Sequence, residues 1–333
     1  KVVLDKNRQG TINQKIYDFS KTDSTVKAYE KNQNIANLSL DDTKALLIYN
    51  VKNSYNLALL QTKALEVREK DLQAKDELYK QADALVKEGI KTKADATSIL
   101  SALYVAKDAF AVTKADLNKA LLTLSFYTGE KIDFNTALVD TTTSQNIQNE
   151  KSILEDMLAK NFLLKSFKEE IERDGLIYDA TKAQNYGSID VVASFTHQNS
   201  LNEYDTSLVG VSVKVPIYSG GRISAQTEQA RISKEITKEA YNSKKLLLEE
   251  EAQSLIIDLD RYKHTLKAKE ALIESSKATK EVVEARYKDG VSTYIEILDA
   301  TSTNLAAELG LLEAKFAVNK IINRLEYLQG ETK

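Results

Sequence analysis

The feature that most constrains this fold is an internal similarity at one fixed offset. Sliding the sequence by 201 residues, without a gap, superimposes residues 16–130 on residues 217–331. Gly89 then falls on Gly290, and both copies end in a Gly-Glu pair. Solenoid repeats recur every 20 to 50 residues or so. A period as long as 201 residues therefore predicts two large, related halves within one chain.

Helix-breaking residues are almost absent from these halves. No glycine or proline lies between Gly10 and Gly89, and the whole chain has a single proline, Pro216. Ala, Leu, Lys, Glu and Gln fill the intervals, which favours helix. We predict a helix from about Lys21 to Glu88, on the order of 100 Å long. Such lengths are typical of coiled coils, membrane spans or helical arrays, and the lysines and glutamates at every turn exclude a helical membrane span.

Each half is predicted to form a long helical hairpin. Apolar residues recur at mixed three- and four-residue steps before Gly290, and a second apolar-periodic run follows each of Gly89 and Gly290. The glycines follow Lys-Glu and Lys-Asp, so each stands where a helix C-terminus needs a left-handed residue. Helices of this kind need lateral neighbours to cover their apolar stripes.

The pattern changes between the two halves. Residues 131–147 are rich in Thr, Asn, Asp and Ser, which predicts a loop, and residues 151–182 are again helical in pattern. Apolar and polar residues then alternate over residues 188–196 and 209–217, which predicts a β-hairpin. One face is apolar and the other carries Asp, Ser, Thr and Lys, as in a membrane β-barrel strand. A half-buried hairpin of a soluble protein gives the same alternation.

Two motifs carry a family resemblance. Residues 215–222 read Val-Pro-Ile-Tyr-Ser-Gly-Gly-Arg, and residues 287–300 read Tyr-Lys-Asp-Gly-Val-Ser-Thr-Tyr-Ile-Glu-Ile-Leu-Asp-Ala. The first copy has Ile-Tyr-Asp-Phe-Ser-Lys at residues 16–21. A strand-to-helix junction and a hairpin tip at mutually consistent distances, within a duplication, closely resemble the TolC family of outer-membrane efflux and export channels. The resemblance covers nearly the whole chain.

The resemblance implies a mainly α fold with a small membrane β-barrel. A homotrimer would form a barrel in the outer membrane of a Gram-negative bacterium, continued through the periplasm by an α-helical barrel of long coiled-coil hairpins. Residues 131–182 would supply much of an equatorial belt around it. The chain would be no enzyme but the exit duct of a tripartite efflux or type I secretion system. It would conduct substrates passively from an inner-membrane transporter, with a periplasmic adaptor as further partner.

The expected organisation has four parts. Residues 1–130 form repeat 1, residues 131–187 a linker and equatorial segment, residues 188–217 the barrel hairpin, and residues 218–333 the repeat 2 hairpin. A helix and a strand precede the second junction, but their counterparts in repeat 1 would lie before residue 1. In repeat 1, only one weak strand pattern precedes residue 20. It covers roughly residues 10–17, and the longest strand that the pattern allows also includes residues 2–4. We expect an omitted N-terminal segment; a barrel with fewer strands is the alternative.

Acidic residues follow the second hairpin tip. Glu296 and Asp299 are three apart and share a helix face, and Asp95 takes the place of Glu296 in the first copy. The resemblance implies that Glu296 and Asp299 form carboxylate rings at the periplasmic entrance of the trimer. Close carboxylates repel one another, which raises some of their pKa values, and they attract cations. A solvated acidic turn on a coiled coil is the simpler alternative.

The resemblance also implies a latch at the entrance. In the family, a tyrosine and an arginine of the second copy bond to an aspartate of the first. Tyr287 and Asp95 match, but Ser292 stands at the arginine position. Loss of a permanent, bidentate cation predicts a weaker or differently built latch, with Lys91 or Lys93 as a substitute.

The hairpin tips resemble the surface by which these channels meet the adaptor. The residues concerned are Gly89 with Ile90, and Gly290 with Val291. Glycine lets another backbone approach closely, and the neighbouring apolar side chain can dock. The alternative is that each glycine is only the turn residue.

Other classes of site are poorly supported. The chain has no cysteine and two histidines, so neither a metal cluster nor a thiol nucleophile can be assembled. His197 is expected in the loop between the two strands and His264 in mid-helix. Gly220-Gly221-Arg222 lacks Walker spacing, and we expect no cofactor. A net charge of −3 offers no basic patch for nucleic acid.

Two hypotheses about the function remain. The leading one is the outer-membrane duct, for which the sequence does not choose between drug efflux, metal efflux and protein export. The rival is a coiled-coil structural or adhesin-like envelope protein without a lumen. The strands favour the duct, because a filament protein has no need of alternation over the span of a bilayer.

Overall fold

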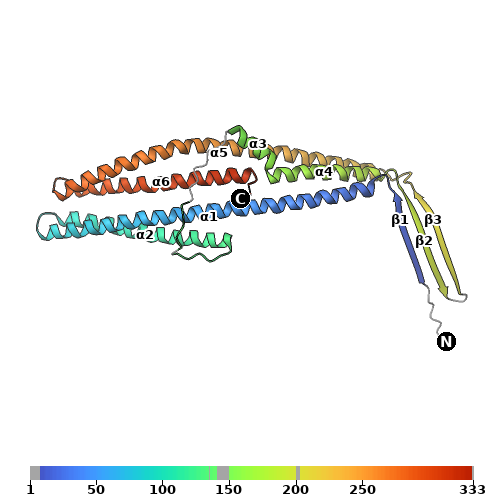
Figure 1. Cartoon of the computed structure of the whole chain (residues 1–333), viewed down its shortest axis with the longest axis horizontal. Coiled ribbons are helices and arrows are strands. Elements are labelled where there is room, and N and C mark those ends of the chain that lie inside the picture. Colours follow the sequence, from blue (N-terminus) through green and yellow to red (C-terminus); the bar gives the residue numbers. More distant parts are fainter. Residues whose placement is uncertain (1–7, 135, 141–149, 200–202, 332–333) are drawn as a thin grey trace, which may run out of the picture. The chain divides into compact units, whose positions relative to one another are not determined.

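The computed structural model describes residues 8–134, 136–140, 150–199 and 203–331 (Figure 1). The chain forms two compact units, Lys1–Asp42 with Phe162–Leu247 and Thr43–Asn161 with Leu248–Lys333. The elements are, in chain order, β1 (Arg8–Tyr17), α1 (Lys21–Lys87), α2 (Lys93–Thr128), α3 (Glu150–Lys160), α4 (Phe162–Ala183), β2 (Ser188–Asn199), β3 (Glu203–Lys214), α5 (Arg222–Lys288) and α6 (Tyr294–Leu328).

The long helices follow the sequence prediction closely. The predicted helix over residues 21–88 is confirmed and ends at Lys87. Both α1 and α5 have 67 residues, and α5 begins and ends 201 positions after α1. The helical stretch predicted over residues 151–182 is two helices, α3 and α4, which meet at Asn161. Residues 131–134 and 136–140 contain no helix or strand, and the rest of the predicted loop lies outside the described residues.

Three apolar clusters lie among the described residues of the unit formed by Thr43–Asn161 and Leu248–Lys333. In the first, α1 packs on α2; in the second, α3, α5 and α6 meet; the third lies close to the hairpin tips. Small residues at the contacts, such as the fully buried Ala58 and Ala82, let helix backbones approach closely. The clusters are, in that order, Ala58, Leu117, Ala120, Leu121 and Leu124; Ile153, Leu259, Ile321 and Leu325; and Leu78, Ala82, Ile99, Tyr287 and Ile297.

In the other unit, the three strands form an antiparallel sheet in the order β1-β2-β3 (Figure 1). Ile12 pairs with Ala193 and Ala193 with Val209, so one apolar row crosses all three strands. Because side chains alternate along a strand, the next rows face the other way, and they are largely polar, as in the row of Lys15, Asp190 and Ser212. The predicted hairpin and its alternation are confirmed.

The strand bounds correct two predictions. The second strand was expected over residues 209–217, but β3 spans Glu203–Lys214, ending before Pro216, which has no N–H to donate to the ladder. The polar stretch before it pairs with β2, because backbone hydrogen bonds do not depend on apolar side chains. His197 therefore lies within β2 and not in a loop, with its Nδ1 2.7 Å from Asp205 Oδ1. β1 begins at Arg8, and residues 2–4 lie outside the described residues.

The strand-to-helix junctions share a backbone conformation. Phe19 and Ser20, before α1, have φ of 55° and 66°, and Gly220 and Gly221, before α5, have φ of 60° and 80°. These pairs are 201 positions apart, so the left-handed turn recurs with and without glycine. Gly187, at the start of β2, has φ of 86°, and a Cβ there would lie 1.9 Å from the carbonyl oxygen of Lys214. Only glycine permits that approach.

Candidate functional site at the hairpin tips

Both hairpin tips end their first helix in the same way. Gly89 and Gly290 have φ of 78° and 73°. The N–H of Gly89 donates to Val86 O at 3.0 Å, and the N–H of Gly290 donates to Tyr287 O at 3.0 Å. The N–H of Ile90 donates to Leu85 O at 2.9 Å, and the N–H of Val291 donates to Arg286 O at 2.8 Å, which completes a Schellman motif at each tip. The predicted left-handed glycines are confirmed.

The second helix of each hairpin starts with a capping box. The Thr92 hydroxyl accepts the N–H of Asp95 at 3.3 Å, and the Asp95 carboxylate accepts the N–H of Thr92 at 3.1 Å. Thr293 and Glu296 repeat this exchange at 3.3 and 3.2 Å. The predicted gate carboxylates Asp95 and Glu296 thus occupy equivalent places, and each satisfies a backbone donor at its own helix start. The Thr-x-x-Asp and Thr-x-x-Glu spacing signals this role in the sequence, and our sequence reasoning missed it.

Glu296 is held as a charged group. The Ser292 hydroxyl donates to its carboxylate, and this bond, followed by the bond from the Thr293 N–H, lowers the pKa of Glu296. Asp299 lies one turn further along α6, and both side chains are exposed. The structure therefore places the two acidic residues on one accessible stretch of α6, where a charged carboxylate can attract a cation.

The three predicted latch residues, all within the described ranges, make no hydrogen bond to one another. Tyr287 is 4% exposed, and its hydroxyl has no hydrogen-bond partner among the described residues. Burial raises the pKa of Tyr287, and the charge of Asp95 raises it further. Ser292 donates to Glu296 and not to Asp95. Of the substitutes, Lys91 places its Nζ 5.4 Å from the Tyr287 ring centre, over the ring face.

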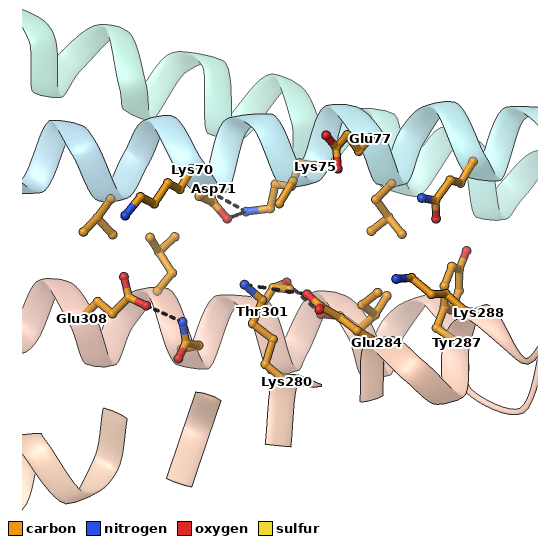
Figure 2. A pocket seen from close by; sticks show the side chains of 17 residues that line it. Lys70, Asp71, Lys75, Glu77, Lys280, Glu284, Tyr287, Lys288, Thr301 and Glu308 are labelled. Atoms are coloured by element: carbon orange, nitrogen blue, oxygen red, sulfur yellow. Dashed lines mark hydrogen bonds and ion pairs between the residues drawn. The ribbon is translucent and has the colours of Figure 1, made fainter. Parts of the chain in front are cut away.

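A cavity of about 230 Å³ lies between α1, α5 and α6, beside Tyr287 (Figure 2). Four lysines and four acidic residues line it, so its charges balance. On α1, Lys75 forms a buried ion pair with Asp71 at 2.8 Å. On the facing helices, the Ser276 hydroxyl donates to buried Asn304 at 3.2 Å. α1 is about 200 residues away in sequence from α5 and α6, which also line the cavity, so no local sequence signal could have revealed it. The charged lining residues are Lys70, Asp71, Lys75, Glu77, Lys280, Glu284, Lys288 and Glu308.

The tips themselves present apolar side chains to their surroundings. Ile90 is 63% and Val291 69% exposed. Neither Gly89 nor Gly290 has another group within 4 Å of where a Cβ would lie, so the space beside each glycine is open. An exposed aliphatic residue next to an unobstructed backbone is suited to docking, and this prediction stays a prediction.

A model of the outer membrane efflux protein family matches residues 7–130 and 153–331. The chain belongs to this family. The match spans both hairpins and all three strands, so it includes each predicted site residue. This outer membrane efflux protein is placed by its relatives in the outer membrane of a Gram-negative bacterium, with the helical part in the periplasm.

Individual relatives agree with the family match. The protein is 24% identical over 191 residues to the outer membrane protein TolC of Vibrio cholerae, an alignment that covers 52% of this chain and 42% of that protein. It is 23% identical over 324 residues to the outer membrane efflux protein BepC of Brucella suis, covering 92% of this chain and 68% of BepC. The chain thus spans less than half the length of the first of these relatives.

The fold also matches solved structures of outer-membrane proteins. The outer membrane protein VceC of Vibrio cholerae superimposes with a TM-score of 0.83 at 13% identity, over 98% of this chain and 86% of VceC. The outer-membrane channel OprN gives a TM-score of 0.86 at 14% identity, over 99% of this chain and 81% of OprN. OprN is thus an outer-membrane channel with the same fold as this chain.

The described part of the chain lacks two further features. No helix there combines the length and the hydropathy needed to cross a bilayer. No group of three or more His, Cys, Asp or Glu side chains among those residues could hold a metal ion.

Proposed function

We propose that the chain is one protomer of a homotrimeric outer-membrane exit duct. In this role it serves a tripartite efflux or type I secretion system and catalyses nothing itself. An inner-membrane transporter delivers the substrate, a periplasmic adaptor joins transporter to duct, and the substrate passes through the lumen to the outside. The two halves of the chain derive, in this proposal, from an internal duplication.

The three-stranded sheet carries this proposal. Val209, Val211 and Val213 are 80%, 70% and 64% exposed, and they lie on the apolar face of the sheet. β1 and β3 each pair with β2 alone among the described strands, so two strand edges are open. A bilayer would cover the apolar face, and closure of the sheet through further copies would remove the edges.

The helices support assembly of several copies. Large apolar side chains remain exposed along α2 and α5, and exposed apolar patches mark interaction surfaces. Neighbouring copies around an axis would cover them, as the helices of a closed array do. The residues concerned are Tyr104, Val105, Leu122 and Phe126 on α2, and Leu246, Ile257 and Val282 on α5.

The function is tested by mass and by conductance. We expect detergent-purified protein to have three times the chain mass of 37.2 kDa in native mass spectrometry. In planar bilayers it should give stepwise currents. Monodisperse rods that need no detergent and conduct nothing would support the coiled-coil structural alternative.

The entrance gate is tested by charge removal. In the trimer, Glu296 and Asp299 would recur threefold, so Glu296→Gln with Asp299→Asn should alter single-channel conductance and weaken block by a trivalent cation. A matched control, Glu170→Gln with Asp179→Asn on α4, removes the same charge away from the tips. Equal block in both variants would exclude a carboxylate gate.

The latch is tested separately. Asp95→Ala should raise the open probability if Asp95 holds the entrance closed. If Asp95→Ala leaves conductance unchanged while the Glu296 and Asp299 variants alter it, the gate stands without the latch. Asp95→Asn, which keeps an acceptor for the Thr92 N–H, separates loss of the charge from loss of the helix cap.

A further inference from the structure

A second charged site lies at the strand-to-helix junction, and none of the roles above uses it. A cavity of about 600 Å³ opens there, within the unit formed by Lys1–Asp42 and Phe162–Leu247. Four basic residues and one acidic residue, Asp18, line it. The basic residues are Lys15, Lys21, Lys214 and Arg222.

The positive charges of this cavity are poorly compensated. The Nζ of Lys15 lies 3.7 Å from Asp18 Oδ2, and the Nζ of Lys214 lies 3.8 Å from Asp190 Oδ2, so both ion pairs are long. The Arg222 guanidinium donates to a neutral partner, the Gln226 amide oxygen, at 3.0 Å. Throughout the described ranges, no carboxylate lies within 4.0 Å of the Lys21 ammonium or the Arg222 guanidinium. A cavity with this balance attracts anions.

The N-termini of α1 and α5 add to the positive electrostatic potential of this cavity. Lys21 and Arg222 are the first residues of α1 and α5, and they are 201 positions apart, so both halves of the chain contribute the same cation. A basic residue at a helix N-terminus adds to the positive end of the dipole, which is unfavourable unless an anion is present. Asp18 caps α1 through the Thr22 N–H at 3.0 Å, whereas the first turn of α5 has no acidic side chain.

The sheet register shows which face carries the cavity lysines. Lys15 pairs with Asp190 and Lys214 pairs with Ser188, so both lysines belong to the polar rows of the sheet. The apolar row nearest to them contains Ile189 and Val213 and points its side chains to the other face of the sheet, and Val213 lies at the rim of the cavity. In a barrel with its apolar face toward lipid, the polar rows face the lumen.

We propose that this cavity is an anion-binding site on the lumen side of the duct, with multivalent phosphate-type or carboxylate-type anions as its ligands. The proposal rests on the proposed function for the direction in which the polar rows face. Lys21 and Arg222 bind the anion, and Lys15 and Lys214 extend the field along the strands. The site gives the duct a basic region through which anionic solutes are attracted or retained, in addition to the acidic residues after the tips.

Block of single-channel current by pyrophosphate tests the site. Pyrophosphate should reduce the current at concentrations where chloride of equal ionic strength does not. In Lys21→Gln with Arg222→Gln, the half-blocking concentration should rise about tenfold or more, because each hydrogen bond to a charged group contributes about 1.5–3 kcal/mol and 1.4 kcal/mol is tenfold. The control pair Lys168→Gln with Lys238→Gln removes the same charge from exposed positions on α4 and α5.

A second pair of variants and a binding measurement separate failure of the anion site from failure of the proposed channel function. Lys15→Gln with Lys214→Gln removes two cavity cations without altering a helix start, and it should weaken block in the same direction. Calorimetry of pyrophosphate binding to detergent-solubilised protein measures the site without conduction, so a channel that fails to conduct would overturn the proposed function and leave the site testable. Equal affinity in the Lys21/Arg222 variant and the control, or equal block by chloride, would overturn the site.

Discussion

Tyr287 carries a buried hydroxyl that has no partner in the described part of the chain. An unpaired buried hydroxyl costs about 1–3 kcal/mol, so we expect Tyr287→Phe to keep the packing and raise the thermal unfolding midpoint. Tyr287→Ala would empty the space beside Leu78, Ile99 and Ile297 and lower stability by about 3–5 kcal/mol. Thermal unfolding in detergent, followed by circular dichroism, measures both.

The half-buried Tyr79 of the same cluster supplies the control, since Tyr79→Phe should change little. A lower midpoint for Tyr287→Phe would mean that the hydroxyl finds a partner in the assembled protein. Asp95, whose charge already acts on Tyr287, would then be the first residue to examine, and the latch prediction would gain support.

Glu296 should give the tip a measurable pH dependence. The Ser292 hydroxyl, then the Thr293 N–H, lowers the pKa of Glu296 below its unfolded value of about 4.3. A lowered folded pKa means that the contribution to stability is complete above about pH 4.3 and is lost as the pH falls through the folded pKa. We therefore expect the difference in thermal midpoint between wild type and Glu296→Gln to shrink as the pH falls below about 4.

Glutamine keeps an acceptor for the Thr293 N–H, so the comparison isolates the charge of Glu296. Glu313→Gln, at an exposed position further along α6, serves as the control. A Glu296→Gln midpoint that differs from wild type by the same amount at every pH would contradict the expectation.

The junctions before α1 and α5 differ in sequence but share a conformation. Ser20 and Gly221 occupy equivalent left-handed positions, and that conformation costs a non-glycine residue about 1–2 kcal/mol. We expect Gly221→Ser to lower the free energy of unfolding by about 1–2 kcal/mol. Ser20→Gly should raise it by less than about 1 kcal/mol, because glycine also gains entropy in the unfolded chain. Denaturant unfolding in detergent measures both.

Gly210→Ala on β3 is the control, since nothing lies within 4 Å of its added Cβ and its φ is not positive. If Ser20→Gly and Gly221→Ser both destabilised the protein, the left-handed conformation would not be the limiting factor. Phe19 is unsuitable for this test, because its ring contacts Tyr17 and Tyr186 at centroid distances of 4.9 and 5.2 Å.

Element by element, the sequence predicted what local rules control. The C-terminal end of α1 and the turns at Gly89 and Gly290 followed from the placement of glycine, because a helix with no breaker continues until a left-handed residue ends it. The start of β3 did not follow, because cross-strand hydrogen bonds extend the ladder through polar residues. The capping boxes were readable and were missed. The two cavities could not be predicted from the sequence, since residues distant in sequence line each of them.

On the scale of the whole molecule, the described part of the chain exposes apolar surfaces and strand edges that other molecules would have to cover. The sheet has two open edges, the helices expose apolar side chains, and Ile90 and Val291 stand uncovered at the tips. The proposed function assigns a different neighbour to each: further copies and lipid to the sheet, further copies to the helices, and an adaptor to the tips. These assignments are separable, because a change at the tips should leave assembly and conductance intact.

Ile90→Lys with Val291→Lys tests the adaptor assignment. Both side chains are exposed, and neither substitution disturbs a left-handed glycine, so the hairpins should fold as in wild type. We expect normal trimer mass and normal bilayer conductance, but loss of most export in cells, because a charged tip cannot be buried against a partner helix without a large desolvation cost. The conservative exchange Ile90→Val with Val291→Ile keeps an apolar tip and should retain export. Full export by the lysine variant, in cells that make normal amounts of protein, would exclude the tips as the adaptor surface.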